Sequence, residues 1–495
     1  MAARPRDWMV EVELVEDDED VSSAPSATPG RSSRALGSPD ATADDADGRA
    51  QHVHRAVRWA TAGVAVAVLT GAIVLAERGQ GADTMIIGPL AEPFTEAWAT
   101  PADEVQAVVG DVVVVRSVAS TTPALRGLDA ATGETLWSVP LNVRGPADTC
   151  AAGVTLDPPT AWCWRERHWV EGPPGRYTLS QEALVGIDVA NGQVVTELEM
   201  TAPSAGQVAV GDDLVMGMRT ESLLTVMRVE PHSWRVSWST NVPLLPRTGG
   251  GLYRANLDVR GDVVVVRGPT TAVLDVEDGR LLARWDPPTE LVNASFDGAD
   301  VAVAEGGFAA WSLEVDGQRD AKGTWYDADG RPVVEIEGRL AEPAVSDGSV
   351  PRVLLVTPDG GRTLAGVDTT SGATLWTTPL EEGEVVARHD GAVLLTQGRA
   401  LRSIEVLTGL ERWAREVDGL RASLTALSDG HTVVVTSLRD HEWTLDAFRV
   451  TDGEPLWFTR VPGTREVSIV TMPPELAVVA DRPVVWVGRT LVWLD

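Results

Sequence analysis

The chain has 495 residues, 44% of them hydrophobic, and a formal net charge of −31. A chain of this length exceeds one ordinary domain, so a repeat architecture or several domains is expected. The strong acidity argues against nucleic-acid binding, which requires a basic surface. Aromatic usage is uneven, with 18 Trp against 3 Tyr and 5 Phe, and this favours a fold that needs Trp repeatedly in one kind of position.

Residues 1–55 are predicted to form a disordered acidic tail, because their Ala, Ser, Pro, Asp and Gly content cannot bury enough apolar surface to fold. The segment 7–20 differs, since it places Trp8, Val10, Val12 and Leu14 before a run of acidic residues. One interpretation is a short motif that docks on a cytoplasmic partner by strand pairing. The other is a chance apolar patch within a disordered tail.

Residues 56–77 are predicted to form a single transmembrane helix. Within 57–76 only Arg58 is charged, and about twenty helical residues cover the roughly 30 Å hydrocarbon core of a bilayer. A buried helix of a soluble domain is the alternative. Arginines before the segment outnumber those after it, which places the N-terminus in the cytoplasm. We expect a retained plasma-membrane anchor, with a linker over 78–93 and an extracytoplasmic domain over 94–495.

Cys150 and Cys163 lie close together in one polar insert. In a cytosolic protein they would be free thiols, whereas in an exported protein they would form a local disulfide. Because the domain is expected outside the membrane, a disulfide between them is predicted.

A turn unit recurs along the predicted domain. Its best copies read GLDAATGETLW from Gly127 and GVDTTSGATLW from Gly366. Weaker copies surround them, at intervals of roughly 40–50 residues, a period that is typical of stacked units such as propeller blades. Each copy reads as a strand, a short turn and a second strand, with a further apolar strand upstream.

The recurring residues have structural interpretations. The glycine supplies positive φ in the turn, and the Asp bonds its own backbone. The Trp is interpreted as a wedge between neighbouring blades. The residues assigned to the repeat are Asp129, Gly133, Trp137, Gly192, Trp238, Gly279, Asp368, Gly372, Trp376, Gly409, Trp413, Gly453 and Trp457.

The predicted fold is therefore all-β, a propeller of four-stranded antiparallel blades that keeps its sheet edges short. The segment EAWATP around Trp98 is predicted to complete one blade with RPVVWVGRTLVWLD at the other end of the domain. Eight turn units plus this composite allow eight or nine blades. We expect eight, because one of the weak copies reads as an insertion. The degenerate copy MRVEPHSWRVSW has Trp234 where the other copies carry the turn glycine.

The pattern LDAATGETLW resembles the Trp-bearing repeat of the PQQ-type quinoprotein propellers, best over 128–137 and 367–376 and more weakly over 95–495. That superfamily includes quinoprotein dehydrogenases and also non-enzymatic scaffolds, such as the lipoprotein propeller of the outer-membrane barrel assembly machine. The resemblance implies the fold and not the cofactor. The enzymes carry vicinal cysteines beside the quinone, unlike Cys150 and Cys163, and their calcium-binding Glu, Asn and Asp set cannot be mapped onto this sequence.

The expected function is that of a single-pass, membrane-anchored bacterial propeller that binds a protein or a cell-envelope ligand, or serves as a scaffold for it. No catalytic, cofactor-binding or metal-ligating residue is assigned, because the sequence has neither the ligand spacing of a zinc site nor a phosphate-binding loop. The alternative is an oxidoreductase that uses PQQ with calcium. A catalytic set assembled from different blades would leave no pattern in the sequence.

Overall fold

The computed structural model describes most of the chain from residue 88 onward. The described ranges are 88–117, 124–141, 150–153, 158–171, 177–200, 204–220, 222–244, 256–268, 270–286, 299–312, 322–380, 383–420, 425–461, 474–479 and 482–495. The predicted tail, with its motif at Trp8, Val10, Val12 and Leu14, and the predicted membrane helix lie outside these ranges. Within them, no helix has the length and apolarity that a membrane crossing requires.

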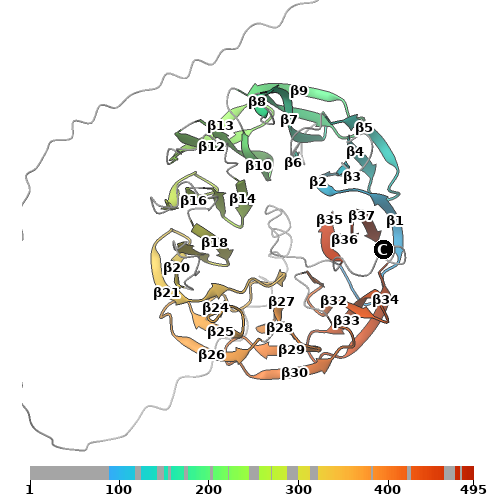
Figure 1. Cartoon of the computed structure of the whole chain (residues 1–495), viewed down its shortest axis with the longest axis vertical. Coiled ribbons are helices and arrows are strands. Elements are labelled where there is room, and N and C mark those ends of the chain that lie inside the picture. The colour runs from blue at the N-terminus through green and yellow to red at the C-terminus, as the bar shows by residue number, and fades with distance from the viewer. Residues whose placement is uncertain are drawn as a thin grey trace, which may run out of the picture. The chain divides into compact units, whose positions relative to one another are not determined.

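Nine β-sheets follow one another around a ring in the described part of the chain (Figure 1). We call them blades 1 to 9 in chain order. Eight of them have four antiparallel strands, and blade 7 has a fifth, which pairs in parallel. The first strand of a blade lies toward the centre of the ring and the last lies at its periphery (Figure 1).

The first three blades are formed by strands that follow one another in chain order. Blade 1 comprises β2 (Glu104–Val109), β3 (Val112–Ser117), β4 (Ala124–Asp129) and β5 (Thr135–Pro140). Blade 2 comprises β6 (Cys150–Gly153), β7 (Thr160–Glu171), β8 (Tyr177–Asp188) and β9 (Val194–Met200). Blade 3 comprises β10 (Ser204–Val210), β11 (Asp213–Arg219), β12 (Leu223–Glu230) and β13 (Arg235–Pro243).

The next three blades supply the charged pocket described below. Blade 4 comprises β14 (Asn256–Arg260), β15 (Val263–Arg267), β16 (Thr271–Asp275) and β17 (Leu281–Trp285). Blade 5 comprises β18 (Ala299–Ala304), β19 (Gly307–Ser312), β20 (Lys322–Asp327) and β21 (Pro332–Glu337). Blade 6 comprises β22 (Arg339–Leu340), β24 (Val353–Thr357), β25 (Thr363–Asp368) and β26 (Thr374–Pro379).

The last three blades complete the ring. Blade 7 comprises β23 (Val345–Ser346), β27 (Glu384–His389), β28 (Ala392–Gln397), β29 (Ala400–Glu405) and β30 (Glu411–Glu416). Blade 8 comprises β31 (Leu427–Ser428), β32 (Thr432–Arg439), β33 (Glu442–Arg449) and β34 (Pro455–Arg460). Blade 9 comprises β35 (Glu475–Val479), β36 (Arg482–Val487), β37 (Thr490–Leu494) and β1 (Glu96–Pro101).

The hydrophobic core is divided among the interfaces between blades. The described residues form nine clusters of buried apolar side chains, and each cluster combines residues of two neighbouring blades. The continuous valine runs of β3 and β15 are explained by this arrangement, because a second strand has a neighbouring blade on both of its faces. Every blade is therefore stabilised by the two beside it.

The two ends of the described chain meet in blade 9. β1 pairs antiparallel with β37, so that Trp98 lies opposite Trp493. The two indole rings stack with centroids 4.9 Å apart. The prediction that the segment around Trp98 supplies the last strand of a composite blade is confirmed.

The predicted number of eight blades is wrong, because the described structure has nine. Each of the eight turn units belongs to a blade of its own, and even the degenerate copy around Trp234 forms β12, a turn and β13 of a complete blade 3. Trp234 itself takes φ of 56° at the place where other copies carry a glycine. A left-handed non-glycine residue is strained, but the Trp234 indole packs edge-on against Trp162 with centroids 5.4 Å apart.

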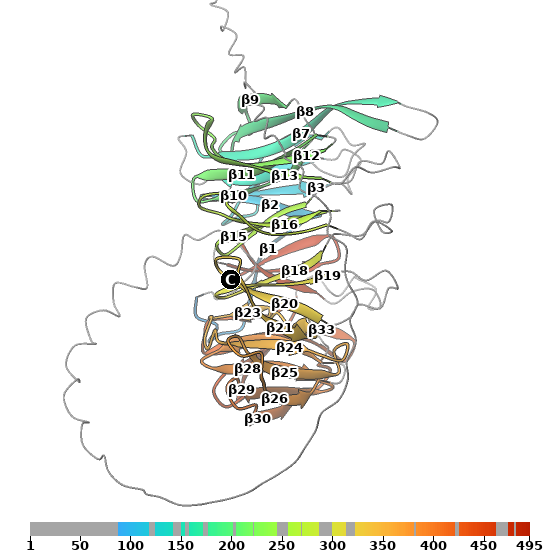
Figure 2. The same cartoon turned by 90° about the vertical axis from the view of Figure 1, so that its left-hand side faces the viewer.

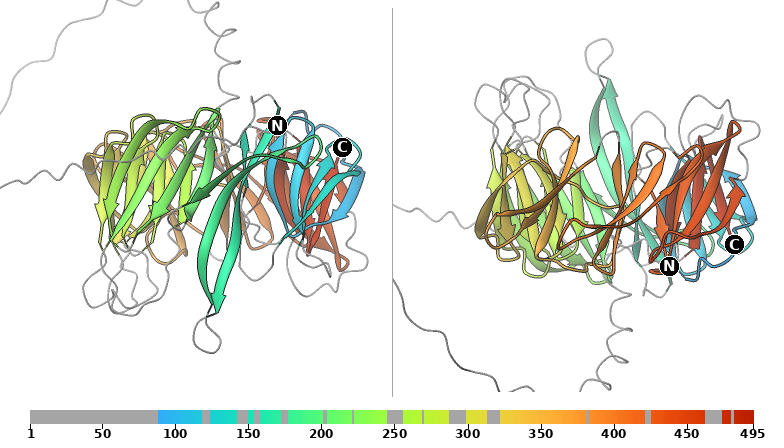
Figure 3. Two further views of the ribbon diagram at one scale, coloured as in Figure 1. Left: turned by 90° about the horizontal axis from the view of Figure 1, so that it is seen from above. Right: turned by 90° about the horizontal axis from the view of Figure 1, so that it is seen from below.

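One hairpin extends beyond the ring. β7 and β8 have 12 residues each, whereas most blade strands have 5 to 8. Figure 2 and Figure 3 show the two strands continuing past the ends of the neighbouring blades on one face of the ring.

Candidate functional site

Four of the recurring Trp side chains lie between blades, and the indole N–H of each donates to a backbone carbonyl in the turn of the next blade. Trp137 donates to Val189 and Trp376 donates to Val406, both with N···O distances of 2.6 Å. The equivalent pairs are Trp238 with Val276 at 3.1 Å and Trp413 with Val450 at 3.0 Å. All four side chains are buried, so their rings are engaged by the fold rather than exposed to a ligand.

The turn glycines lie under these rings. Gly192 and Gly409 have φ of 73° and 70°, and a Cβ atom at either position would come within 2.8 Å of Trp137 and 2.6 Å of Trp376 respectively. Gly133 faces Trp98, Gly279 faces Trp238, Gly453 faces Trp413, and Gly372 faces Val334. The glycine therefore meets two requirements at once, a left-handed backbone and room for the neighbouring indole.

The turn aspartates bind their own loops. The Oδ1 atom of Asp129 accepts hydrogen bonds from the backbone N–H and the hydroxyl of Thr132, at 2.8 and 2.9 Å. Asp368 accepts the same pair from Ser371, both at 2.9 Å. The hydroxyl donors, followed by the backbone N–H groups, lower the pKa of both carboxyls below the usual value. These carboxylates stabilise the turns.

Cys150 and Cys163 form a disulfide. They are directly paired in register across β6 and β7. Cys163 is fully buried in the cluster between blades 1 and 2, and Cys150 packs against that cluster. The bond therefore belongs to the framework of blade 2.

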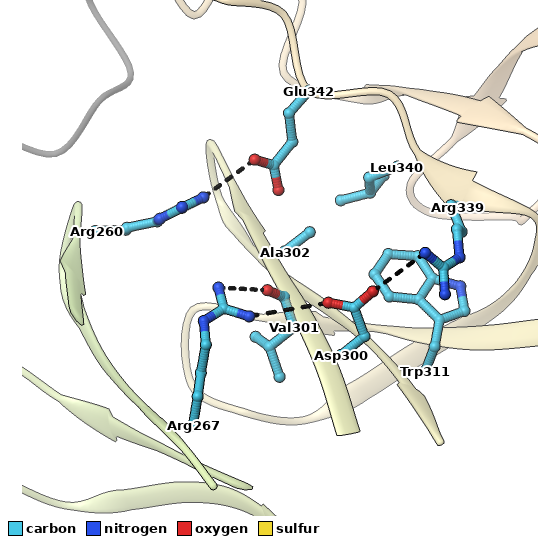
Figure 4. Close-up of a pocket in the computed structure, with 9 residues that line it drawn as sticks. All are labelled: Arg260, Arg267, Asp300, Val301, Ala302, Trp311, Arg339, Leu340 and Glu342. Atoms are coloured by element: carbon cyan, nitrogen blue, oxygen red, sulfur yellow. Dashed lines mark hydrogen bonds and ion pairs between the residues drawn. The ribbon is translucent and has the colours of Figure 1, made fainter. Parts of the chain in front are cut away.

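A charged pocket of about 220 Å³ lies where blades 4, 5 and 6 meet, along the inner strand β18 (Figure 4). Three arginines, two acids and four apolar residues line it. They are Arg260, Arg267, Asp300, Val301, Ala302, Trp311, Arg339, Leu340 and Glu342. Charged residues from three successive blades meet here, whereas the repeat residues described above are distributed evenly around the ring.

Asp300 lies between two arginines at one end of the pocket (Figure 4). Its carboxylate is 3.8 Å from Nη1 of Arg267 and 3.5 Å from Nη1 of Arg339. Arg267 also donates from Nη2 to the carbonyl oxygen of Val301 at 2.9 Å. Both ion pairs are longer than the roughly 2.7–2.9 Å of a charge-assisted hydrogen bond, so one carboxylate is shared loosely by two guanidinium groups.

Arg260 crosses the pocket at the other end. Its Nη1 atom is 3.1 Å from Oε2 of Glu342, and its Nε atom is 2.9 Å from Oδ2 of Asp258. The pair between Arg260 and Glu342 joins blade 4 to blade 6 across blade 5. Arg260 has two close carboxylates, so its charge is compensated better than those of Arg267 and Arg339.

The apolar wall comes from β18, β19 and β22. Trp311 is 4% exposed, and its indole N–H donates to the carbonyl oxygen of Gly338 at 2.7 Å. Ala302 is small, which leaves space above β18 that a larger side chain would fill. Trp311 is thus fixed as part of the wall, beside two half-neutralised guanidinium groups.

The pocket is suited to binding an anion with a small apolar part. Guanidinium groups bind carboxylates through two parallel hydrogen bonds. Both carboxylates of the lining, Asp300 and Glu342, are engaged in ion pairs with its arginines.

The pair of cysteines and the charged pocket lie in different parts of the ring. The disulfide lies in blade 2, whereas the pocket belongs to blades 4 to 6. Within the described ranges, no three His, Cys, Asp or Glu side chains converge as metal ligands. No reaction step is derived through PQQ or calcium.

Sequence reasoning did not identify the pocket residues. Arg260 and Arg267 flank an ordinary valine strand, and Asp300, Arg339 and Glu342 come from two later copies of the repeat. None of them belongs to the recurring motif. Arginine at the position of Arg267 is not distinctive either, because β3 carries Arg116 at the same place.

Part of the chain matches a known family. Residues 337–493 match the family described as outer membrane protein assembly factor BamB. No curated protein sequence matches the chain significantly.

Several solved structures are similar to the chain at low identity. BamB from Moraxella catarrhalis is 14% identical over 81% of this chain and 99% of its own, with a TM-score of 0.40. The computationally designed Ika8 protein is 12% identical over 81% and 98%, with a TM-score of 0.42. Quinohemoprotein alcohol dehydrogenase from Comamonas testosteroni is 10% identical over 81% and 76%, with a TM-score of 0.40.

Proposed function

We propose that this chain, whose residues 337–493 match the family described as outer membrane protein assembly factor BamB, is a non-enzymatic binding or scaffold module for a protein or another cell-envelope ligand. The observation that carries the proposal is the contrast between two sets of residues. The recurring Asp, Gly and Trp residues are engaged in turns and blade interfaces. Charged residues of three successive blades, none of them part of the recurring Asp, Gly and Trp motif, line one pocket on blades 4 to 6.

The proposed location is outside the plasma membrane, with the chain held by the predicted helix over 56–77. The disulfide between Cys150 and Cys163 supports an oxidising compartment, since such bonds are rare in the cytosol. Protease added to intact cells should then digest the propeller. Protection of the propeller would contradict the proposed location while leaving the binding function open to its own test.

The binding function is tested by cross-linking in intact cells, followed by purification of the full chain and identification of what is retained. One reproducible partner or envelope component, absent when an unrelated exported protein is purified in the same way, is the expected result. Recovery of the chain alone under these conditions would contradict the proposal.

The competing function, a PQQ-dependent oxidoreductase, is tested by titration of the full chain with PQQ and calcium. Quinone absorbance reports binding, and alcohol- or sugar-dependent dye reduction reports turnover. We expect neither saturable binding nor turnover. Stoichiometric binding with turnover would replace the scaffold function by the enzymatic one.

A further inference from the structure

The two ends of the pocket on blades 4 to 6 differ in how well carboxylates neutralise their arginines. Arg260 is paired with both Glu342 and Asp258, whereas, among the described residues, Asp300 is the carboxylate that Arg267 and Arg339 share. The end of the pocket around Asp300 therefore carries one positive charge in excess. This excess stands out in a chain whose net charge is −31.

We propose that this pocket binds a carboxylate group of a peptide partner between Arg267 and Arg339, with the adjoining apolar group against Trp311 and Leu340. The proposal rests on the binding function proposed above and names the chemistry that the site recognises. The carboxylate can belong to a chain end or to an acidic side chain, and both present the same two oxygen atoms.

A carboxylate matches the charge and the donors better than a phosphate does. One excess positive charge balances a monoanion, whereas a dianion would face the carboxylates of Asp300 and Glu342 with an uncompensated charge. Arginine offers a planar pair of donors that fits a carboxylate. An incoming carboxylate can approach at normal hydrogen-bond distance, which Asp300 does not reach at 3.5 and 3.8 Å.

The size of the pocket favours one end of a larger partner. Its volume is about 220 Å³, below the roughly 300–1,000 Å³ of sites that enclose a whole small molecule. Leu340 is half-buried and Trp311 is fixed by its hydrogen bond to Gly338. A carboxylate and a short apolar group fill this space, and the remainder of the peptide would lie outside it.

Three short acetylated peptides test the assignment by calorimetric titration of the full chain. The first ends in leucine with a free carboxylate, the second is its C-terminal amide, and the third is an amide with an internal aspartate. We expect binding of the first, the third or both, and none of the second. Binding of the first alone assigns a chain end, and binding of the third alone assigns an acidic side chain. Binding of none of the three, or equal binding of acid and amide, would overturn the proposal.

Variants separate recognition from folding. The double variant Arg267→Gln/Arg339→Gln should weaken carboxylate binding by at least about tenfold, because it removes two charged donors. Arg331→Gln is the matched control, since Arg331 is exposed and pairs with Asp329 in the outer turn of blade 5. Asp300→Asn should tighten binding, because it removes the internal competitor. Unchanged binding in the double variant, or weaker binding in a folded Asp300→Asn protein, would overturn the assignment.

The two proposals fail in distinguishable ways. A chain that retains a partner in cells but binds no carboxylate peptide would overturn the carboxylate assignment and keep the binding function. A chain that binds the peptides with the expected variant pattern but retains no cellular partner would support the site and contradict the scaffold function.

Discussion

The indole N–H of Trp457 donates a hydrogen bond to the carbonyl oxygen of Leu90 at 2.8 Å, across 367 positions of the sequence. For Trp137, Trp238, Trp376 and Trp413 the equivalent acceptor lies in the turn of the following blade. Blade 9 has no such turn, because its last two strands, β37 and β1, come from opposite ends of the described chain. The segment before β1 supplies the carbonyl instead, and Leu90, itself 1% exposed, closes the last interface.

The Trp wedge predicts a large difference between two adjacent residues of β26. Trp376→Ala should lower the free energy of unfolding by about 3–5 kcal/mol, because it leaves a cavity between blades 6 and 7. Leu375 is 45% exposed, so Leu375→Ala should change that free energy by no more than about 0.5 kcal/mol. Denaturant unfolding of the full chain measures both. Equal effects of the two variants would contradict the role of Trp376 as a wedge between blades 6 and 7.

The contact between the turn glycine and Trp predicts that alanine substitution destabilises the protein more at Gly409 than at Gly398. Gly409 and Gly398 have φ of 70° and 58°, so alanine is strained by about 1–2 kcal/mol at both. A Cβ at Gly409 would lie 2.6 Å from Trp376, whereas nothing lies within 4 Å at Gly398. Gly409→Ala should therefore destabilise the protein more than Gly398→Ala does. Indistinguishable unfolding midpoints would show that backbone conformation alone requires the glycine.

These turns also show how much of the fold the sequence could predict. The recurring Asp, Gly and Trp report interactions within one repeat or with its neighbour, so period and spacing predicted the propeller and its composite blade. The predicted blade number was wrong because one weak copy was discounted as an insertion, whereas every copy forms a blade, even the one with a left-handed Trp234 at the glycine position. The pocket was not predictable, because Arg267, Asp300 and Arg339 meet only when three blades are assembled.

The turn carboxylates predict a pH dependence. The hydroxyl and N–H groups of Ser371 lower the pKa of Asp368 below its usual value of 3.8. A lowered pKa in the folded state contributes stability that is present above the usual value and is lost as the pH falls through the folded one. Asp368→Ala should therefore be less stable than the wild type at pH 7, and the difference should shrink below about pH 4. A difference that is constant from pH 7 to pH 2.5 would contradict this role.

The disulfide predicts a local contribution to stability. Closing so short a loop between Cys150 and Cys163 is worth about 3 kcal/mol in the chain-entropy model. Cys150→Ala/Cys163→Ala should lower the free energy of unfolding by that amount, and reduction of the wild type should have a similar effect. Mass spectrometry of the unreduced, thiol-blocked protein should find no alkylated cysteine. Two alkylated cysteines in protein purified from its native compartment would contradict the proposed location.

The most direct test of the central claim, that this propeller binds its partner through the pocket on blades 4 to 6, is retention of the cross-linked partner by charge-reversed variants. Arg267→Glu/Arg339→Glu reverses the two arginines around Asp300. Arg280→Glu/Arg331→Glu is the matched control, because these arginines lie in the outer turns of blades 4 and 5, 48% and 73% exposed. We predict that the pocket variant loses the partner and the control keeps it, with both proteins folded. Equal retention by the two variants would contradict the claim.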